Sequence, residues 1–269
     1  MRARKYLHAL LCCLLVPLPF LFPMIGNLPS AGEFPRMEQY FVLNFMGFPA
    51  QGLDPSLLYF VLTQLVPEIA LFYLLSGTFL SDYETNAVYV FTRIGNKQRW
   101  LRQKALELFC QVCAAVLFTF LVTALFGTAG GYRFSGQGAP VYLRLLLFQI
   151  LPAFVLLFIQ NFASLSLGRT QSFLLLVVFY AGSILLGGLF FNQTPIGNLL
   201  IALLPPSSQM YAWHAGSPNV VGIPGTPLAG FTAVFSAVWM AVCFAAAYAV
   251  SSVILQKKDL IALVKGDAA

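Results

Sequence analysis

The sequence predicts an all-α membrane protein with six transmembrane helices. Of its 269 residues, 59% are hydrophobic and 9% are charged, whereas a soluble domain carries about 25% charged residues. Six windows hold about 20 mostly apolar residues, which is the length that crosses a bilayer as a helix. The basic residues lie at the ends of these windows and concentrate on one side, as they do in membrane proteins.

Each window is expected to be helical, because lipid leaves the backbone N–H and C=O groups no partners except one another. No segment is polar enough for a separate soluble domain, so 1–269 is expected to form a single transmembrane domain. The first window resembles a signal peptide, but its cleavage site, near 30–32, is poor and a helix is favoured. The expected spans are 7–25, 57–80, 105–126, 141–163, 173–191 and 231–255.

The distribution of Lys and Arg predicts that both termini are cytoplasmic. With the N-terminus inside, only three of the 15 basic residues, Arg36, Arg133 and Arg144, face outward. The basic residues behind the net charge of +6 lie where they would orient the protein in the membrane, so the charge does not indicate nucleic acid as a partner. The inner residues are Arg2, Arg4, Lys5, Arg93, Lys97, Arg99, Arg102, Lys104, Arg169, Lys257, Lys258 and Lys265.

The third outer loop, 192–230, has six prolines and five glycines among its 39 residues. It contains a short apolar run, 196–204, which ends at Pro205 and Pro206. Nine residues are too few to span a bilayer, so the run suits a re-entrant segment. A helix lying on the outer surface remains the alternative.

The sequence gives little indication of catalysis. His8 and His214 are the two histidines of the chain and neither belongs to an HExxH motif, which makes a zinc site improbable. Cys110 and Cys113 form a CxxC without a second pair, inside an apolar helix, where small packing residues are expected. The chain has no GxxxxGK[ST] phosphate loop, so any ATP hydrolysis is expected in another polypeptide.

Three polar residues within the expected spans are candidates for a functional role. Glu68 is near the centre of the second span, next to Pro67, and is expected to face protein or water because a carboxylate is costly in hydrocarbon. Two readings are open: a substrate- or proton-linked site, and a protonated carboxyl that helps helices to pack. Glu107 and Gln111 share a face of the third span, and Glu107 can pair with Arg102, Lys104 or the second helix.

The inner loop between the second and third spans carries the most specific pattern. Residues 83–93 can form a short helix with an acidic start, a basic end and apolar groups, which include Val88, Tyr89 and Phe91. Gly95 and Asn96 end it, and Asn96 can cap a new helix into the third span. Trp100 is expected at the membrane interface, beside the basic residues that follow.

This loop, together with the six expected spans and the inner N-terminus of the chain, resembles the membrane subunits of ATP-binding-cassette (ABC) exporters. The most similar are the small type V permeases linked to antimicrobial-peptide export or immunity. The short helix is followed by Arg-Ile-Gly-Asn-Lys-Gln-Arg-Trp at 93–100, and Gln-Lys-Lys-Asp-Leu at 256–260 is similar to the basic-Asp ending of that group. The run at 196–204 also looks like their outer re-entrant helices.

The resemblance implies a permease of the bacterial plasma membrane that forms a translocation path. Residues 84–93 would be the coupling helix, with Glu84, Val88, Tyr89, Phe91 and Arg93 contacting a separate ATPase. Two ATPase copies, which bind ATP and Mg, would pair with two permeases, identical or homologous. No cofactor is implied in this chain itself.

Three alternatives remain open. The chain could be an ion- or proton-coupled secondary carrier with Glu68 as the titrating group, although no internal repeat supports this. It could be a membrane enzyme, which the absence of a catalytic cluster disfavours. It could also be an assembly protein with no transport activity.

Overall fold

A computed structural model describes residues 36–45, 47, 55–93, 97–136, 138–216 and 227–257, with side chains except at 55–64, 86–93 and 257. The expected first span, 7–25, lies outside these residues. The described helices are α3 (Met37–Phe45), α4 (Pro55–Leu75), α5 (Thr78–Arg93), α6 (Lys97–Ala129), α7 (Ala139–Leu167), α8 (Arg169–Phe190), α9 (Pro195–Leu203), the 3-10 turns η2 (Pro205–Gln209) and η3 (Tyr211–Trp213), and α10 (Ala233–Lys257).

Five stretches of the described residues are helical, long and apolar enough to cross a membrane. Four correspond to α6, α7, α8 and α10, and the fifth, Leu65–Thr85, runs from α4 into α5. Five of the six expected spans are thus confirmed as sufficiently long apolar helices. The second differs in detail, because α4 ends at Leu75 rather than continuing to residue 80.

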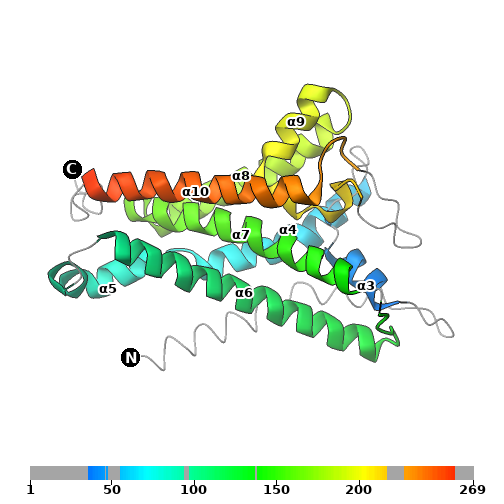
Figure 1. Ribbon diagram of the computed structural model, residues 1–269, viewed down its shortest axis with the longest axis horizontal. Coiled ribbons are helices and arrows are strands. Elements are labelled where there is room, and N and C mark those ends of the chain that lie inside the picture. The colour runs from blue at the N-terminus through cyan, green and yellow to red at the C-terminus, as the bar shows by residue number, and fades with distance from the viewer. Residues whose placement is uncertain are drawn as a thin grey trace.

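The long helices lie roughly side by side and form an elongated bundle (Figure 1). One end carries α5, the start of α6 and the end of α10, and is called the α5 end below. The opposite end carries α3 and is called the α3 end, and α9 stands off the bundle near it (Figure 1). The basic side chains described at the α5 end are Lys97, Arg99, Arg102, Lys104 and Arg169.

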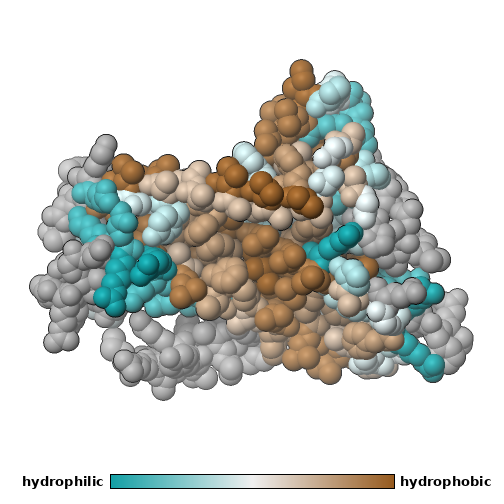
Figure 2. All heavy atoms as spheres, in the orientation of Figure 1, coloured by the Kyte–Doolittle hydropathy of each residue, from teal (hydrophilic) through white to brown (hydrophobic). Residues whose placement is uncertain are grey.

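Apolar side chains cover the middle of the face shown in Figure 2, and polar ones gather at its two ends. On α10, the exposed apolar side chains include Val234, Val238 and Val242, while α8 exposes Leu174 and Leu175. Apolar surface of this extent is disfavoured in water and is the normal surface of a protein in lipid. The bundle therefore has the surface of a multi-pass membrane protein.

Helix α7 is the centre of the bundle. In its most apolar stretch 61% of the residues are buried, against 17% in α10. It packs against α3, α4, α5, α6, α8, α10 and η2. Its buried face includes four polar residues, Gln149, Gln160, Asn161 and Ser164, which inside a membrane require partners on neighbouring helices.

The α3 end is closed by short elements that pack inward. Helix α3 lies in the expected first outer loop and buries Phe41 and Phe45 against Phe120 of α6, with ring centroids 5.2 and 4.6 Å apart. Its first backbone N–H, at Met37, donates to the Arg133 carbonyl at 2.8 Å. Two segments predicted to be loops are therefore tied to each other and to the bundle.

Residues 205–216 also differ from the expected exposed loop. As expected, Pro205 and Pro206 follow the end of α9, but η2 and η3 then turn back against α7 and α8 with most of their side chains buried. His214 is stacked between Phe148 and Phe231, with ring centroids 4.0 and 4.4 Å away. Because prolines and glycines are frequent in this loop, the sequence did not indicate that Tyr211, Trp213 and His214 are buried.

The hydrogen bonds of His214 fit a neutral ring. Nδ1 lies 3.0 Å from the Met210 carbonyl, which can only accept, so Nδ1 is the donor. Nε2 then accepts from the Ser236 hydroxyl at 2.7 Å. Burial, aided by the charge of Arg144, lowers the pKa of His214 from 6.5 to about 4.

This pKa shift predicts that acid loosens the segment around His214. The unfolded histidine takes up a proton below about pH 6.5 and the folded one only near pH 4, so stability falls across that window, by about 3 kcal/mol. Thermal unfolding of the wild type and of His214→Gln, measured from pH 7 to pH 4, gives the contribution of His214 by difference. Parallel curves for the two proteins would contradict the prediction.

Candidate functional site

The junction of α4 and α5 is a sharp break at Ser76 and Gly77, called the α4–α5 turn. Gly77 has φ +70°, and an added Cβ would come within 2.9 Å of the Arg169 side chain. Glycine meets both requirements of this position, a left-handed backbone and a close neighbour. The turn leaves backbone groups unpaired at the end of α4 and the start of α5.

Asn161 of α7 supplies partners for both helix ends at this turn. Its Nδ2 donates to the Leu75 carbonyl at the end of α4, at 2.9 Å, and to the Leu157 carbonyl, also at 2.9 Å. Its Oδ1 accepts from the backbone N–H of Thr78 at 2.7 Å and from the Thr78 hydroxyl at 3.0 Å. All four hydrogen-bonding positions of the amide are used, and the side chain is fully buried.

Arg169, the first residue of α8, holds the same turn from a second side. Its Nε donates to the Ser76 hydroxyl at 3.0 Å, and Nη2 donates to the Tyr73 carbonyl at 3.1 Å. The guanidinium also lies over the Tyr73 ring, 5.3 Å from its centroid. The α4–α5 turn is therefore attached to α7 through Asn161 and to α8 through Arg169.

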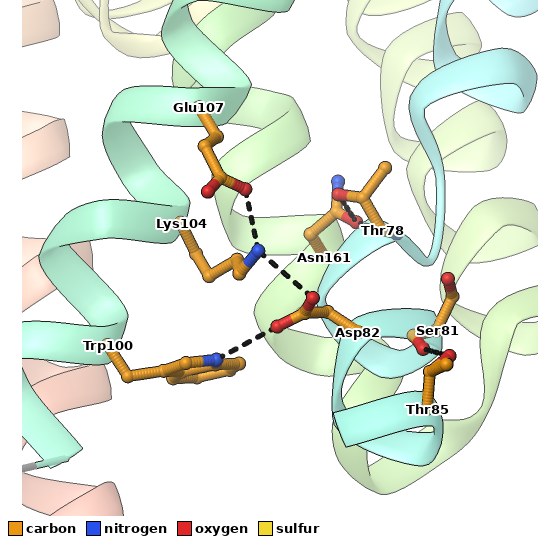
Figure 3. Close-up of polar contacts among 8 residues, drawn as sticks. All are labelled: Thr78, Ser81, Asp82, Thr85, Trp100, Lys104, Glu107 and Asn161. Carbon is orange, nitrogen blue, oxygen red and sulfur yellow. Dashed lines mark hydrogen bonds and ion pairs between the residues drawn. The ribbon is translucent and has the colours of Figure 1, made fainter. Parts of the chain in front are cut away.

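The first turns of α5 are attached to α6 through Asp82 (Figure 3). Asp82 accepts from Trp100 Nε1 at 3.2 Å and pairs with Lys104 Nζ, also at 3.2 Å. Trp100 is 3% exposed and packs on Phe79 of α5. α5 thus offers the indole N–H of Trp100 a buried acceptor, and the expected depth of Trp100 at the membrane interface stays a prediction.

Helix α5 contains the short helix expected at 83–93, but it begins at Thr78. Of the residues expected to contact an ATPase, Glu84 is exposed on this helix. The backbone at Val88, Tyr89, Phe91 and Arg93 is helical, and their side chains lie outside the described ones. Thus α5 is anchored at its start, while Glu84 points to a surface that the described bundle leaves open.

Glu68 lies in the interior of the bundle, as expected, and is 8% exposed. Its Oε1 accepts from Gln209 Nε2 of η2 at 3.2 Å. The Gln209 Oε1 in turn accepts from the Tyr180 hydroxyl of α8 at 2.6 Å. The three side chains form a buried polar chain, called the Glu68 cluster, that connects α4, η2 and α8.

The other two expected polar residues lie on α6, apart from this cluster. Glu107 is exposed and accepts from Lys104 at 2.6 Å, as one of the expected pairings. Gln111 is partly buried, and its Oε1 has no hydrogen-bond partner among the residues that the structure describes. In the described residues no group of His, Cys, Asp or Glu could hold a metal ion, and Cys110 and Cys113 are free.

Comparison with known proteins gives one match. Residues 28–261 match the family described as a protein of unknown function (DUF2705). The chain belongs to this family. No curated protein and no solved structure is similar enough to the chain to count as a match.

The DUF2705 match extends from before α3 to beyond α10, so both the α4–α5 turn and the Glu68 cluster lie within it. Sequence analysis missed Asn161, Arg169 and Gln209. A signal for Asn161 was present, since Gln160 and Asn161 interrupt an otherwise apolar span, and such residues inside a membrane require partners. The sequence held no signal for Gln209, because polar residues are ordinary in a Pro-rich loop.

The Asn161 contacts predict a stability loss in Asn161→Ala. This change leaves the Leu75 carbonyl and the Thr78 N–H without their side-chain partner and removes four hydrogen bonds, which costs about 2–4 kcal/mol. Thermal unfolding in detergent measures the loss. Ser166→Ala, on an exposed position of the same helix, is the control and should shift Tm little. Equal shifts in the two variants would contradict the assigned role of Asn161.

Proposed function

We propose that this chain is the permease subunit of an ABC exporter and that α5 is its coupling helix. The observation that carries the proposal is the attachment of α5. Asn161 bonds to its first residue, Asp82 in its second turn bonds to α6, and Arg169 holds the turn that precedes it. From there α5 continues to the α5 end of the bundle (Figure 1). A helix that transmits motion needs a firm attachment on one side and an accessible surface on the other.

The proposed topology places the α5 end in the cytoplasm. The described basic residues of α6 and α8 lie there, whereas Arg36, Arg133 and Arg144 lie at the α3 end or close to it. The positive-inside rule then orients the five described spans. A sixth span at 7–25 would bring the N-terminus to the cytoplasmic side as well.

The attachment suggests how a partner would act on the membrane domain. A push on α5 reaches α7 through the buried amide of Asn161 and α8 through the guanidinium of Arg169. These two helices pack against each other, and α7 contacts most of the remaining bundle. An ATPase that binds α5 differently in its ATP-bound and free states would thereby favour one arrangement of the helices.

In this proposal ATP and Mg bind the partner subunit, and a second permease completes the translocation path. Helix α9 would lie in the outer leaflet of the bilayer, as a re-entrant or interfacial segment. It exposes Ile196, Leu199 and Leu200 on one side and buries Ile201 and Ala202 on the other. An exposed apolar stripe of this kind is stable in contact with lipid.

Copurification tests the proposal directly. When the chain is expressed with the products of its neighbouring genes and extracted in mild detergent, an ATPase subunit should copurify with it. The complex should hydrolyse ATP, and vanadate should inhibit the hydrolysis. Isolation of the chain without any ATPase under these conditions would refute the ABC assignment.

The coupling role of α5 predicts the effect of Tyr89→Ala combined with Phe91→Ala. Removing two aromatic groups from the helix should weaken the bound ATPase and separate ATP hydrolysis from transport, while the thermal unfolding of the membrane domain stays unchanged. Leu174→Ala with Leu175→Ala, on the exposed face of α8, is the control double variant. ATPase binding and transport that match the control would exclude α5 as the coupling helix.

A further inference from the structure

The carboxyl group of Glu68 is buried with few hydrogen-bond donors around it. Among the side chains that the structure describes, only Gln209 Nε2 donates to it, at 3.2 Å to Oε1, and Oε2 has no hydrogen-bond partner. An ionised carboxylate that leaves water generally requires several donors or a cation, because its desolvation costs several kcal/mol. One hydrogen bond from a neutral amide does not meet that need.

In the described part of the chain, no charged side chain beside Glu68 compensates for the missing donors. Glu68 lines a cavity of about 20 Å³ whose other walls come from α3, α4, α6 and α7 and include no ionisable residue. These residues are Phe45, Pro67, Leu71, Val116, Thr119 and Gln149. The titratable group that approaches Glu68 from α8 is the Tyr180 hydroxyl, and on the η2 side Gln209 is uncharged. The ion pairs among the described residues join Lys104 to Asp82 and Glu107.

The orientation of the cluster leaves Oε2 as the position for a proton. The Tyr180 hydroxyl donates to Gln209 Oε1, so the Gln209 amide must present its N–H₂ group to Glu68 Oε1. Oε1 is thereby an acceptor. The unpartnered Oε2 is then free to carry hydrogen, beside a cavity with room for about one water molecule.

We propose that Glu68 is a proton-binding site inside the membrane domain, occupied in the arrangement described here, and that loss of the proton favours separation of residues 205–213 from α4. The ionised carboxylate needs more water than the cavity holds. Gln209, which donates to Glu68, belongs to the short 3-10 turn η2, whereas the cavity walls from α6 and α7 belong to long helices. Since binding and conformation are linked, the return of Gln209 to Glu68 in turn favours proton uptake.

Infrared spectroscopy of the full-length protein in nanodiscs tests the proton. At about pH 6 the wild type should show the C=O stretch of a buried carboxylic acid, and Glu68→Gln should lack it. Glu107→Gln removes an exposed, ion-paired carboxylate from α6 and should leave the band in place. Tyr180→Phe removes the donor to Gln209 and should shift the band without abolishing it.

An unchanged carboxylic-acid band in Glu68→Gln would overturn the proposal. If that variant does not fold, the wild type and Tyr180→Phe still decide the matter, since absence of the band in the wild type or an identical frequency in both would also overturn it. The presence of a bound ATPase is irrelevant to this measurement, so its failure and that of the ABC assignment are separate results.

Hydrogen exchange of the backbone at 205–213 tests the link to conformation. Wild type and Glu68→Gln are compared at the same pH, so the intrinsic pH dependence of exchange cancels. The two should match at about pH 6, and the wild type should exchange at least about tenfold faster at about pH 9, where only it can ionise. Equal rates at both pH values would refute the coupling between Glu68 and this segment.

Discussion

The buried amide of Asn161 is the interaction on which the rest of the architecture depends. An apolar helix in a membrane cannot turn sharply unless the backbone groups it exposes find partners. Asn161 provides them for the last carbonyl of α4 and the first N–H of α5. Without this residue the Leu75 carbonyl and the Thr78 N–H would lose their side-chain partner inside the bundle.

The membrane class and five of the helical spans could be predicted from the sequence, because apolar length and the absence of charge determine where a chain can cross lipid. The α4–α5 turn could not. Residues 69–80 read as continuous apolar sequence, and a single Gly77 gives no reason to expect a break. What decides the break is a side chain on α7, which sequence periodicity does not connect to α4.

The candidate sites show the same division. Glu68 could be singled out, since a carboxylate in an apolar span is exceptional. Its environment could not be anticipated, because Gln209 comes from a segment rich in Pro and Gly that reads as an exposed loop. Trp100 and Lys104 were correctly placed near the start of a helix. Their contact with Asp82 could not be predicted, because it depends on how α5 packs against α6.

The attachment of the α4–α5 turn to α7 has a consequence for biosynthesis. Leu75 and Asn161 are 86 residues apart in the chain. At roughly 5–20 residues per second, a ribosome needs on the order of ten seconds to reach Asn161 after it has made the turn. During that interval α5 and α6 are synthesised while the turn still lacks its partner. The nascent protein must therefore pass through a stage in which water, a lipid headgroup or the insertion machinery satisfies those backbone groups until α7 arrives.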